Sequence, residues 1–177
     1  MSTKVKNFEI VNSKLIDGVK IIIPSIHHDL RGTLFTTYYD EVYTGLIPKG
    51  INFKHDKFAR TLQRVLRGVH GDFKSWKLVT AVYGEITQVV VDNRIDSPTF
   101  KKWEKFNING AEPKLILLPP GVGNAFYVHS LDAVYHYKLA YHGEYFDAED
   151  QFTIKWNDPK FGIEWPDMDP ILSERDK

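Results

Sequence analysis

Three side chains that could take part in proton chemistry lie close together in the stretch LRGVHGDFKSWKLV, which runs from Leu66 to Val79. They are Arg67, His70 and Lys77. Histidine accepts and releases protons near neutral pH, so His70 is the strongest candidate for a general base. Lys77 could stabilise negative charge that develops on a substrate oxygen. The alternatives are a histidine satisfied by backbone hydrogen bonds and a lysine that faces solvent at a strand edge.

Glycines interrupt this stretch where strand residues are expected, because Gly68 and Gly71 flank the histidine. Alternate residues of a regular strand face opposite ways, so Arg67 and His70 would point to opposite faces of the sheet. If both side chains serve one site, the strand must carry a bulge near Gly68. The glycines then leave room for a ligand or for a close backbone approach.

Histidine is also a common metal ligand, but the spacing of the seven histidines does not favour a metal site. Metal-binding members of the small β-barrel class usually present two histidines separated by one residue, and no such pair occurs in this chain. His27 and His28 are adjacent, so a strand would direct them to opposite faces. The chain has no cysteine, which excludes disulfides, thiolate catalysis and zinc–thiolate sites and fits a reducing compartment. We therefore expect no metal.

Length and charge exclude several classes of protein. The 177 residues suffice for one well-buried core, so we expect a single domain over residues 1–177. The formal net charge is zero, which argues against a general binder of nucleic acid or of a membrane surface. The first ten residues hold no apolar signal core, and no run approaches the roughly 18 apolar residues of a membrane helix. We expect a cytoplasmic protein.

Short strands must position these side chains, because the apolar residues recur with a period of two rather than 3.6. The expected strands end at Gly, Pro, Asn or Asp. This pattern indicates an all-β sandwich or barrel. Residues 77–83 and 87–92 look like paired strands around Gly84 and Glu85, and residues 40–46 could form a short helix capped by Asp40. The other expected strands cover residues 20–24, 32–38, 114–118, 125–128 and 133–141.

The strand expected at 133–141 has one face rich in tyrosine. Tyr135, Tyr137, Leu139 and Tyr141 share this face, because they alternate along the strand. Tyrosines at a barrel mouth pack their rings and direct their hydroxyls to a ligand. The alternative is an ordinary strand whose aromatic residues fill the core.

Two charged segments also leave two interpretations open. Arg31 could bind a phosphate group or merely pair with the nearby Asp29. The sequence SERD at 173–176 is expected in solvent by default. That default fails if Asp176 folds back and holds one tautomer of a histidine.

Taken together, these motifs resemble the dTDP-4-dehydrorhamnose 3,5-epimerase family, almost from end to end and in the same order. Each motif alone is weak evidence, but their common order is highly specific. The motifs are DLRG at 29–32, LRGVH at 66–70, KLV at 77–79, GE at 84–85 followed by VVVD at 89–92, DSPTF at 96–100 with Trp103, PPG at 119–121, YK at 137–138, WND at 156–158, GIEWP at 162–166 and LSERD at 172–176.

The resemblance implies an all-β, cupin-type jelly roll with a few short helices, a homodimer, no cofactor, and action on nucleotide-linked 4-keto sugars. By position, His70 resembles the catalytic base, Asp176 its carboxylate partner and Tyr137 the general acid. Lys77 resembles the lysine near the C4 oxygen of the sugar. The residues expected to bind substrate are Arg31, Arg67, Asn124, His55, Lys57 and Tyr145.

Three departures from the family pattern bear on the substrate. Asn124 stands where the family usually has a histidine, the loop between His70 and Lys77 is short and begins with Gly71-Asp72, and residues 141–147 replace the usual Thr-x-x-Tyr-Tyr-x-Pro region. These features resemble the branch that acts on GDP-linked 4-keto-6-deoxy-heptoses for capsule synthesis. We therefore expect a GDP-heptose substrate, with a dTDP-linked 4-keto-6-deoxy-hexose as the alternative.

The implied chemistry is inversion at C3, at C5 or at both carbons. The C4 ketone acidifies the neighbouring C–H bonds, so a base can remove a proton and an acid can return one to the opposite face of the ring. Proton transfer of this kind needs no redox cofactor. Two other functions are compatible with the same residues: a 3,4-ketoisomerase on the same scaffold, and a non-catalytic module that binds sugars on the tyrosine-rich face.

Overall fold

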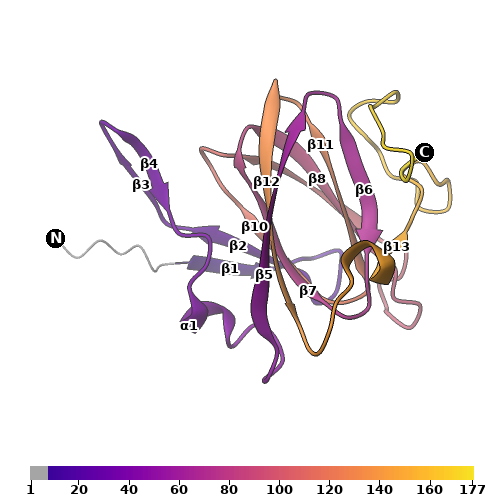
Figure 1. The fold of residues 1–177 in the computed structure, drawn as a ribbon, viewed down its shortest axis with the longest axis horizontal. Coiled ribbons are helices and arrows are strands. Elements are labelled where there is room, and N and C mark those ends of the chain that lie inside the picture. The colour runs from indigo at the N-terminus through magenta and orange to yellow at the C-terminus, as the bar shows by residue number, and fades with distance from the viewer. Residues whose placement is uncertain (1–7) are drawn as a thin grey trace.

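The structure, a computed structural model, describes residues 8–177, so the expectation about the N-terminus lies largely outside the described part. Two β-sheets face each other in these residues, which confirms the predicted all-β jelly roll (Figure 1). The elements are β1 (Phe8–Asn12), β2 (Lys20–Pro24), β3 (Ile26–Asp29), β4 (Gly32–Phe35), α1 (Asp40–Tyr43), β5 (Asn52–Leu62), β6 (Leu66–Gly71), β7 (Trp76–Tyr83), β8 (Glu85–Asp92), β9 (Trp103–Asn109), β10 (Leu115–Leu118), β11 (Val122–Val128), β12 (Asp132–Tyr141), the 3-10 helix η1 (Asp147–Asp150) and β13 (Phe152–Thr153).

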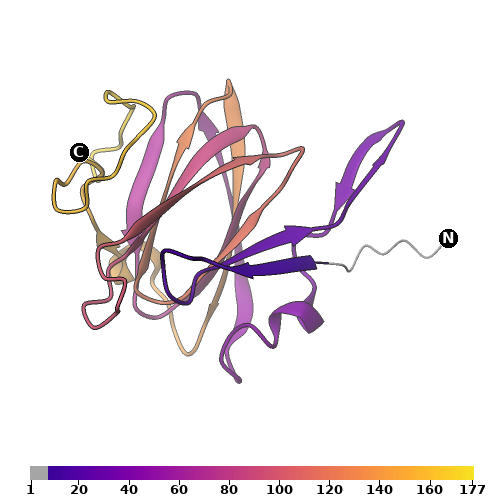
Figure 2. The same ribbon diagram turned by 180° about the vertical axis from the view of Figure 1, so that it is seen from behind.

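The two main sheets have six and five strands. The six-stranded sheet has the order β1-β2-β10-β7-β12-β5, and the five-stranded sheet has the order β13-β6-β11-β8-β9. A separate hairpin, β3–β4, extends away from both sheets, as the two opposite views show (Figures 1 and 2). The hairpin carries Arg31 in its turn, so this side chain lies apart from the barrel.

The expected pairing of residues 77–83 with 87–92 is wrong. β7 pairs with β10 and β12, whereas β8 pairs with β9 and β11 in the other sheet. Gly84 makes the turn between them with φ of +80°, and a Cβ there would lie 2.4 Å from the carbonyl oxygen of Asp132. The chain therefore crosses from one sheet to the other at a corner that only glycine fits.

The expected helix is present but shorter than predicted. α1 spans only Asp40–Tyr43, and its N-cap is Tyr39 rather than Asp40. Asp40 instead accepts a hydrogen bond of 2.7 Å from the Tyr38 hydroxyl, so its carboxylate does not cap the helix. No helix within residues 8–177 is long and apolar enough to span a membrane.

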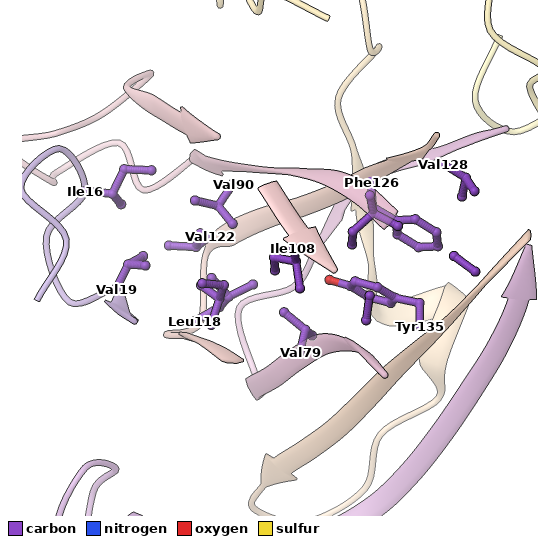
Figure 3. Packing of buried hydrophobic residues seen from close by; sticks show 14 residues of the cluster. Ile16, Val19, Val79, Val90, Ile108, Leu118, Val122, Phe126, Val128 and Tyr135 are labelled. Carbon is purple, nitrogen blue, oxygen red and sulfur yellow. The ribbon is translucent and has the colours of Figure 1, made fainter. Parts of the chain in front are cut away.

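Apolar side chains of both sheets fill the space between them (Figure 3). Phe126 of β11 and Tyr135 of β12 stack across this core, with ring centroids 4.1 Å apart. Tyr135 is fully buried and belongs to the core. For this residue the alternative interpretation, aromatic packing in the core, is correct. Tyr137, two residues further along β12, lines a cavity instead.

β6 carries the bulge that a shared site for Arg67 and His70 requires. His70 lies opposite Asn124 of β11, and Arg67 lies opposite Phe126. Two residues of β6 therefore face one residue of β11, and this extra residue reverses the alternation of the side chains. Arg67 and His70 consequently both reach the same cavity.

Gly68→Ala should destabilise the protein by about 2–4 kcal/mol, because it adds both backbone strain and overpacking. Gly68 has φ of +116°, and a Cβ there would lie 2.6 Å from the Cβ of Ala125. Chemical denaturation would measure the loss. Gly45→Ala is the matched control, since its Cβ meets nothing within 4 Å. Equal stability of the two variants would contradict the prediction.

Candidate active site

A cavity of about 460 Å³ opens between the two sheets. Its wall includes side chains from β5, β7 and β12 of one sheet, from β6 and β11 of the other, and from the segments around residues 147–151 and 173–176. This volume lies in the range of small-molecule binding sites. The cavity brings together the four side chains expected to do chemistry: His70, Lys77, Tyr137 and Asp176.

His70 and Asp176 form a hydrogen-bonded pair on one side of the cavity. The Nε2 atom of His70 lies 2.6 Å from Oδ1 of Asp176, which is almost fully buried. The hydroxyl of Ser173 donates to the other carboxylate oxygen at 2.8 Å. Burial alone would raise the pKa of Asp176, but the hydrogen bonds from His70 and Ser173 outweigh burial and hold the pKa below its ordinary value.

This pairing fixes which nitrogen of the ring can act as a base. The ionised carboxylate of Asp176 accepts the proton on Nε2, which leaves the lone pair on Nδ1 of His70. The C-terminal segment thus folds back onto the barrel, and the expectation of a solvent-exposed tail is wrong for Asp176. Burial of the carboxylate also prevents water from replacing the histidine as its partner.

Tyr137 approaches the same cavity from the opposite sheet, on β12. Burial is the largest influence on the Tyr137 phenol and raises its pKa, and the positive charge of Arg67 only partly opposes this rise. The phenol is therefore protonated at neutral pH and can donate its proton. The structure places this potential acid and His70 on different sheets around one cavity, and Asp176 contacts His70 from the C-terminal segment.

Lys77 enters the cavity from β7, where its neighbours across the sheet are Leu118 and Leu139. Its side chain is only 7% exposed, and its Nζ lies 2.8 Å from Oδ2 of Asp72. The alternative of a solvent-facing lysine at a strand edge is therefore wrong. A buried cation at this point can stabilise negative charge on a bound oxygen more strongly than a cation in water.

The chain is similar to known proteins over most of its length. The family model for dTDP-4-dehydrorhamnose 3,5-epimerase matches residues 13–177. The dTDP-4-dehydrorhamnose 3,5-epimerase of Salmonella typhimurium is 33% identical over 171 residues, which cover 94% of this chain and 92% of the relative. The chain belongs to the dTDP-4-dehydrorhamnose 3,5-epimerase family. It is a sugar nucleotide 3,5-epimerase, and hence an isomerase.

Solved structures of other epimerases have the same fold. The Legionella pneumophila epimerase in complex with dTDP-4-keto-L-rhamnose has a TM-score of 0.86 and 34% identity, covering 96% of this chain and 90% of that chain. A 3'-monoepimerase from Streptomyces bikiniensis in complex with dTDP-quinovose has a TM-score of 0.83 and 30% identity, covering 94% of this chain and 84% of that chain. These similarities agree with the cupin-type jelly roll predicted for the epimerase.

Three of the six expected substrate-binding residues line the cavity of the epimerase. They are Arg67, Asn124 and Lys57. The Nε atom of Arg67 donates to the hydroxyl of Thr61 at 3.0 Å. Asn124 is nearly buried, and its side-chain oxygen accepts hydrogen bonds from Gln88 and Tyr135, so its amide is held in one orientation.

The other three expected residues do not line this cavity within one chain. Arg31 is exposed in the β3–β4 turn and pairs with Asp29 there. His55 lies on β5 and is not part of the cavity wall. Tyr145 also stays outside the wall, although its hydroxyl donates to Asp72, the partner of Lys77, at 3.1 Å.

Three residues near the cavity were missed in the sequence. Arg175 lines the cavity, and its position beside Asp176 could have indicated this. Asp147 also lines the cavity and pairs with Lys57 at 2.5 Å, a contact across 90 residues that no local pattern reveals. Asp72 was noted only as part of an unusual loop. Within residues 8–177, no three His, Asp or Glu side chains come together as a metal site.

Asp176→Asn should lower kcat of the epimerase at least about 10–100-fold, the cost of removing the carboxylate that orients a metal-bound imidazole. An asparagine amide in place of the carboxylate no longer selects the His70 tautomer with its lone pair on Nδ1. Steady-state kinetics would measure the loss. Glu174→Gln, an exposed neighbour in the same turn, is the control and should retain parental activity. Equal losses in both variants would contradict the prediction.

Proposed function

We propose that the epimerase inverts C3 and C5 of a dTDP-linked 4-keto-6-deoxy-hexose. The relatives support this substrate, because they are named as dTDP-4-dehydrorhamnose 3,5-epimerases and the Legionella enzyme is in complex with dTDP-4-keto-L-rhamnose. They favour it over the GDP-linked heptose expected from the three sequence departures. The observation that carries the reaction is the single cavity with the His70–Asp176 pair on one sheet side and Tyr137 on the other.

The reaction begins with removal of a proton from the carbon next to the C4 ketone. The C–H bond breaks, the proton moves to Nδ1 of His70, and the electron pair passes to the C4 oxygen as an enolate. Asp176 stabilises the imidazolium that forms, and Lys77 stabilises the negative oxygen. Tyr137 then donates its proton to the opposite face of the same carbon as the C4 ketone re-forms. The phenolate regains a proton from solvent, and the His70 imidazolium releases its proton to solvent. Inversion follows because base and acid occupy opposite sheets.

We also propose that the chain acts as one domain and assembles as a homodimer through the β3–β4 hairpin. The hairpin extends away from the barrel (Figures 1 and 2). Leu30 and Leu34 on it are exposed apolar residues. Arg31 lies at the same turn and does not line the cavity of its own chain. A second copy packed against the hairpin would cover this apolar surface and receive Arg31 near its bound diphosphate. Light scattering that compares the molar mass of Leu34→Asp in solution with that of the parent tests this assembly.

Proton NMR in heavy water tests the proposed function. The epimerase is mixed with dTDP-linked or GDP-linked 4-keto-6-deoxy sugars, and the spectra show which carbons exchange and which product forms. We expect deuterium at C3 and C5 of the dTDP-linked hexose, with inversion at both carbons. Exchange at C3 alone would indicate a monoepimerase, and a carbonyl moved to C3 would indicate a ketoisomerase. Exchange confined to GDP-linked heptose would overturn the substrate, and exchange with neither would overturn the reaction.

A further inference from the structure

Asp72 receives an unusually complete set of hydrogen-bond donors just behind the cavity wall. Its Oδ1 accepts from the backbone N–H groups of Lys74 at 2.9 Å and Ser75 at 2.6 Å. Its Oδ2 accepts from the Ser75 hydroxyl at 2.8 Å and the Tyr145 hydroxyl at 3.1 Å, and it lies 2.8 Å from Nζ of Lys77. The carboxylate is fully buried, so these contacts fix its position.

Because Lys77 is buried, its positive charge needs the carboxylate of Asp72 as a partner. A lysine ammonium in a buried strand loses its hydration, which is costly unless an opposite charge compensates. Asp72 supplies that charge in direct contact with Nζ. This contact uses one of the three N–H donors of the ammonium. The remaining donors are available to a ligand in the cavity that Lys77 lines.

We propose that Asp72 is the positioning residue for Lys77: it holds the ammonium at the cavity wall and keeps it charged for the enolate oxygen. This inference rests on the proposed epimerase reaction and deepens it. Asp72 itself does not line the cavity, so it acts on the substrate only through Lys77. The short loop that begins with Gly71-Asp72 thus has a chemical role in this chain, which its length alone did not indicate.

Other charged groups near Lys77 do not supply the same contact. Asp147 also faces this region from the η1 segment, but it pairs with Lys57 of β5 at 2.5 Å. The positive charge of Lys57 opposes protonation of Lys77, and Asp147 favours it. The neighbouring phenols of Tyr137 and Tyr145 are neutral, because burial raises the pKa of each. Among residues 8–177, Asp72 is therefore the only carboxylate found in contact with Lys77.

These contacts determine in which direction a change of pH alters the activity. Burial lowers the pKa of Lys77 below its ordinary value, and the charge and hydrogen bond of Asp72 oppose this decrease. Removing the negative charge of Asp72 lowers the pKa of Lys77 further. The lysine then loses its proton at a lower pH, so activity that needs the ammonium is lost earlier as the pH rises.

Asp72→Asn tests the proposal with little change in shape, because the asparagine oxygen still accepts from the N–H groups of Lys74 and Ser75. We expect kcat at neutral pH to fall about 10–100-fold, the loss seen when the partner that positions a metal ligand is removed. The alkaline limb of the kcat profile should move down by about one pH unit or more. Asp150→Asn is the matched control, because it removes a carboxylate that pairs with Lys74, from the same loop, and leaves Lys77 untouched.

A double-mutant cycle with Lys77→Met separates positioning from a merely structural role. If Asp72 acts through Lys77, Asp72→Asn adds no further loss of kcat once Lys77 is replaced. A full additional loss in the double variant would overturn the proposal. So would an Asp72→Asn variant whose melting temperature falls while its pH profile matches that of the parent.

An NMR titration of lysine labelled with 13C at Cε gives a readout that needs no substrate. The Lys77 signal, assigned by its absence in Lys77→Met, should titrate at a lower pH in Asp72→Asn than in the parent. An unchanged titration would overturn the inference even if the parent is an active epimerase. If the parent shows no exchange with any sugar but the Lys77 titration moves, the proposed reaction fails while the contact with Asp72 stands.

Discussion

His70→Asn should abolish deuterium incorporation at both C3 and C5 of the 4-keto sugar while the fold is retained. Removing a general base costs about 10²–10⁴-fold in rate, and among residues 8–177 no other histidine lines the cavity to replace it. The Ser173 hydroxyl still donates to Asp176, so the buried carboxylate keeps a partner when the imidazole is removed. Proton NMR in heavy water measures the exchange at each carbon.

His142→Asn is the matched control for this experiment, because His142 is exposed in the loop after β12 and lies outside the cavity wall. It should exchange both protons at the parental rate. Full exchange in His70→Asn would remove His70 from the role of base. A loss in both variants would show that the effect is not specific to the cavity.

Tyr137→Phe should lose net inversion much more than it loses proton exchange. His70 remains in this variant, so it can still remove a proton and return it to the same face of the sugar. The opposite face has lost its donor, since burial raises the pKa of the Tyr137 phenol and keeps it protonated in the parent. We expect inversion to fall about 10²–10⁴-fold, the usual contribution of a general acid. Product NMR measures inversion, and deuterium content measures exchange in the same sample.

Tyr141→Phe provides the comparison for Tyr137→Phe, because it removes a hydroxyl from the same strand but outside the cavity wall. This variant should retain both exchange and inversion. If Tyr137→Phe inverted the sugar as fast as the parent, the proton would have to reach the second face from another donor, and the assignment of Tyr137 as the acid would be refuted.

Local patterns in the sequence predicted several strands correctly, but they missed β1, β3, β5, β9 and β13 and did not give all of the partners. β7 and β8 are both strands as predicted, and both are buried along most of their length. Their partners depend on packing between distant segments, however, and a glycine at a turn fits either a hairpin or a corner between sheets. The pairing of β7 with β8 was therefore predicted wrongly, whereas the bulge at Gly68 was predicted correctly from the required direction of two side chains.

In the candidate site, too, contacts between distant segments could not be predicted from local patterns. His70, Lys77 and Tyr137 could be selected because their side chains have suitable chemistry beside glycines or on a tyrosine-rich strand. Asp72 and Asp147 could not, because an acidic residue in a loop looks the same whether it faces solvent or a buried lysine. Their contacts with Lys77 and Lys57 arise only when the loops fold against the barrel.

The stacked rings of Phe126 and Tyr135 link core packing to stereochemistry. Tyr135 precedes Tyr137 by two residues on β12, and Phe126 faces Arg67 of the strand that carries His70. The 4.1 Å contact between the rings therefore packs the strand that carries Tyr137 against the neighbour of the strand that carries His70. A substitution that changes the volume of either ring is therefore expected to change the separation of the two strands, and with it the distance between His70 and Tyr137.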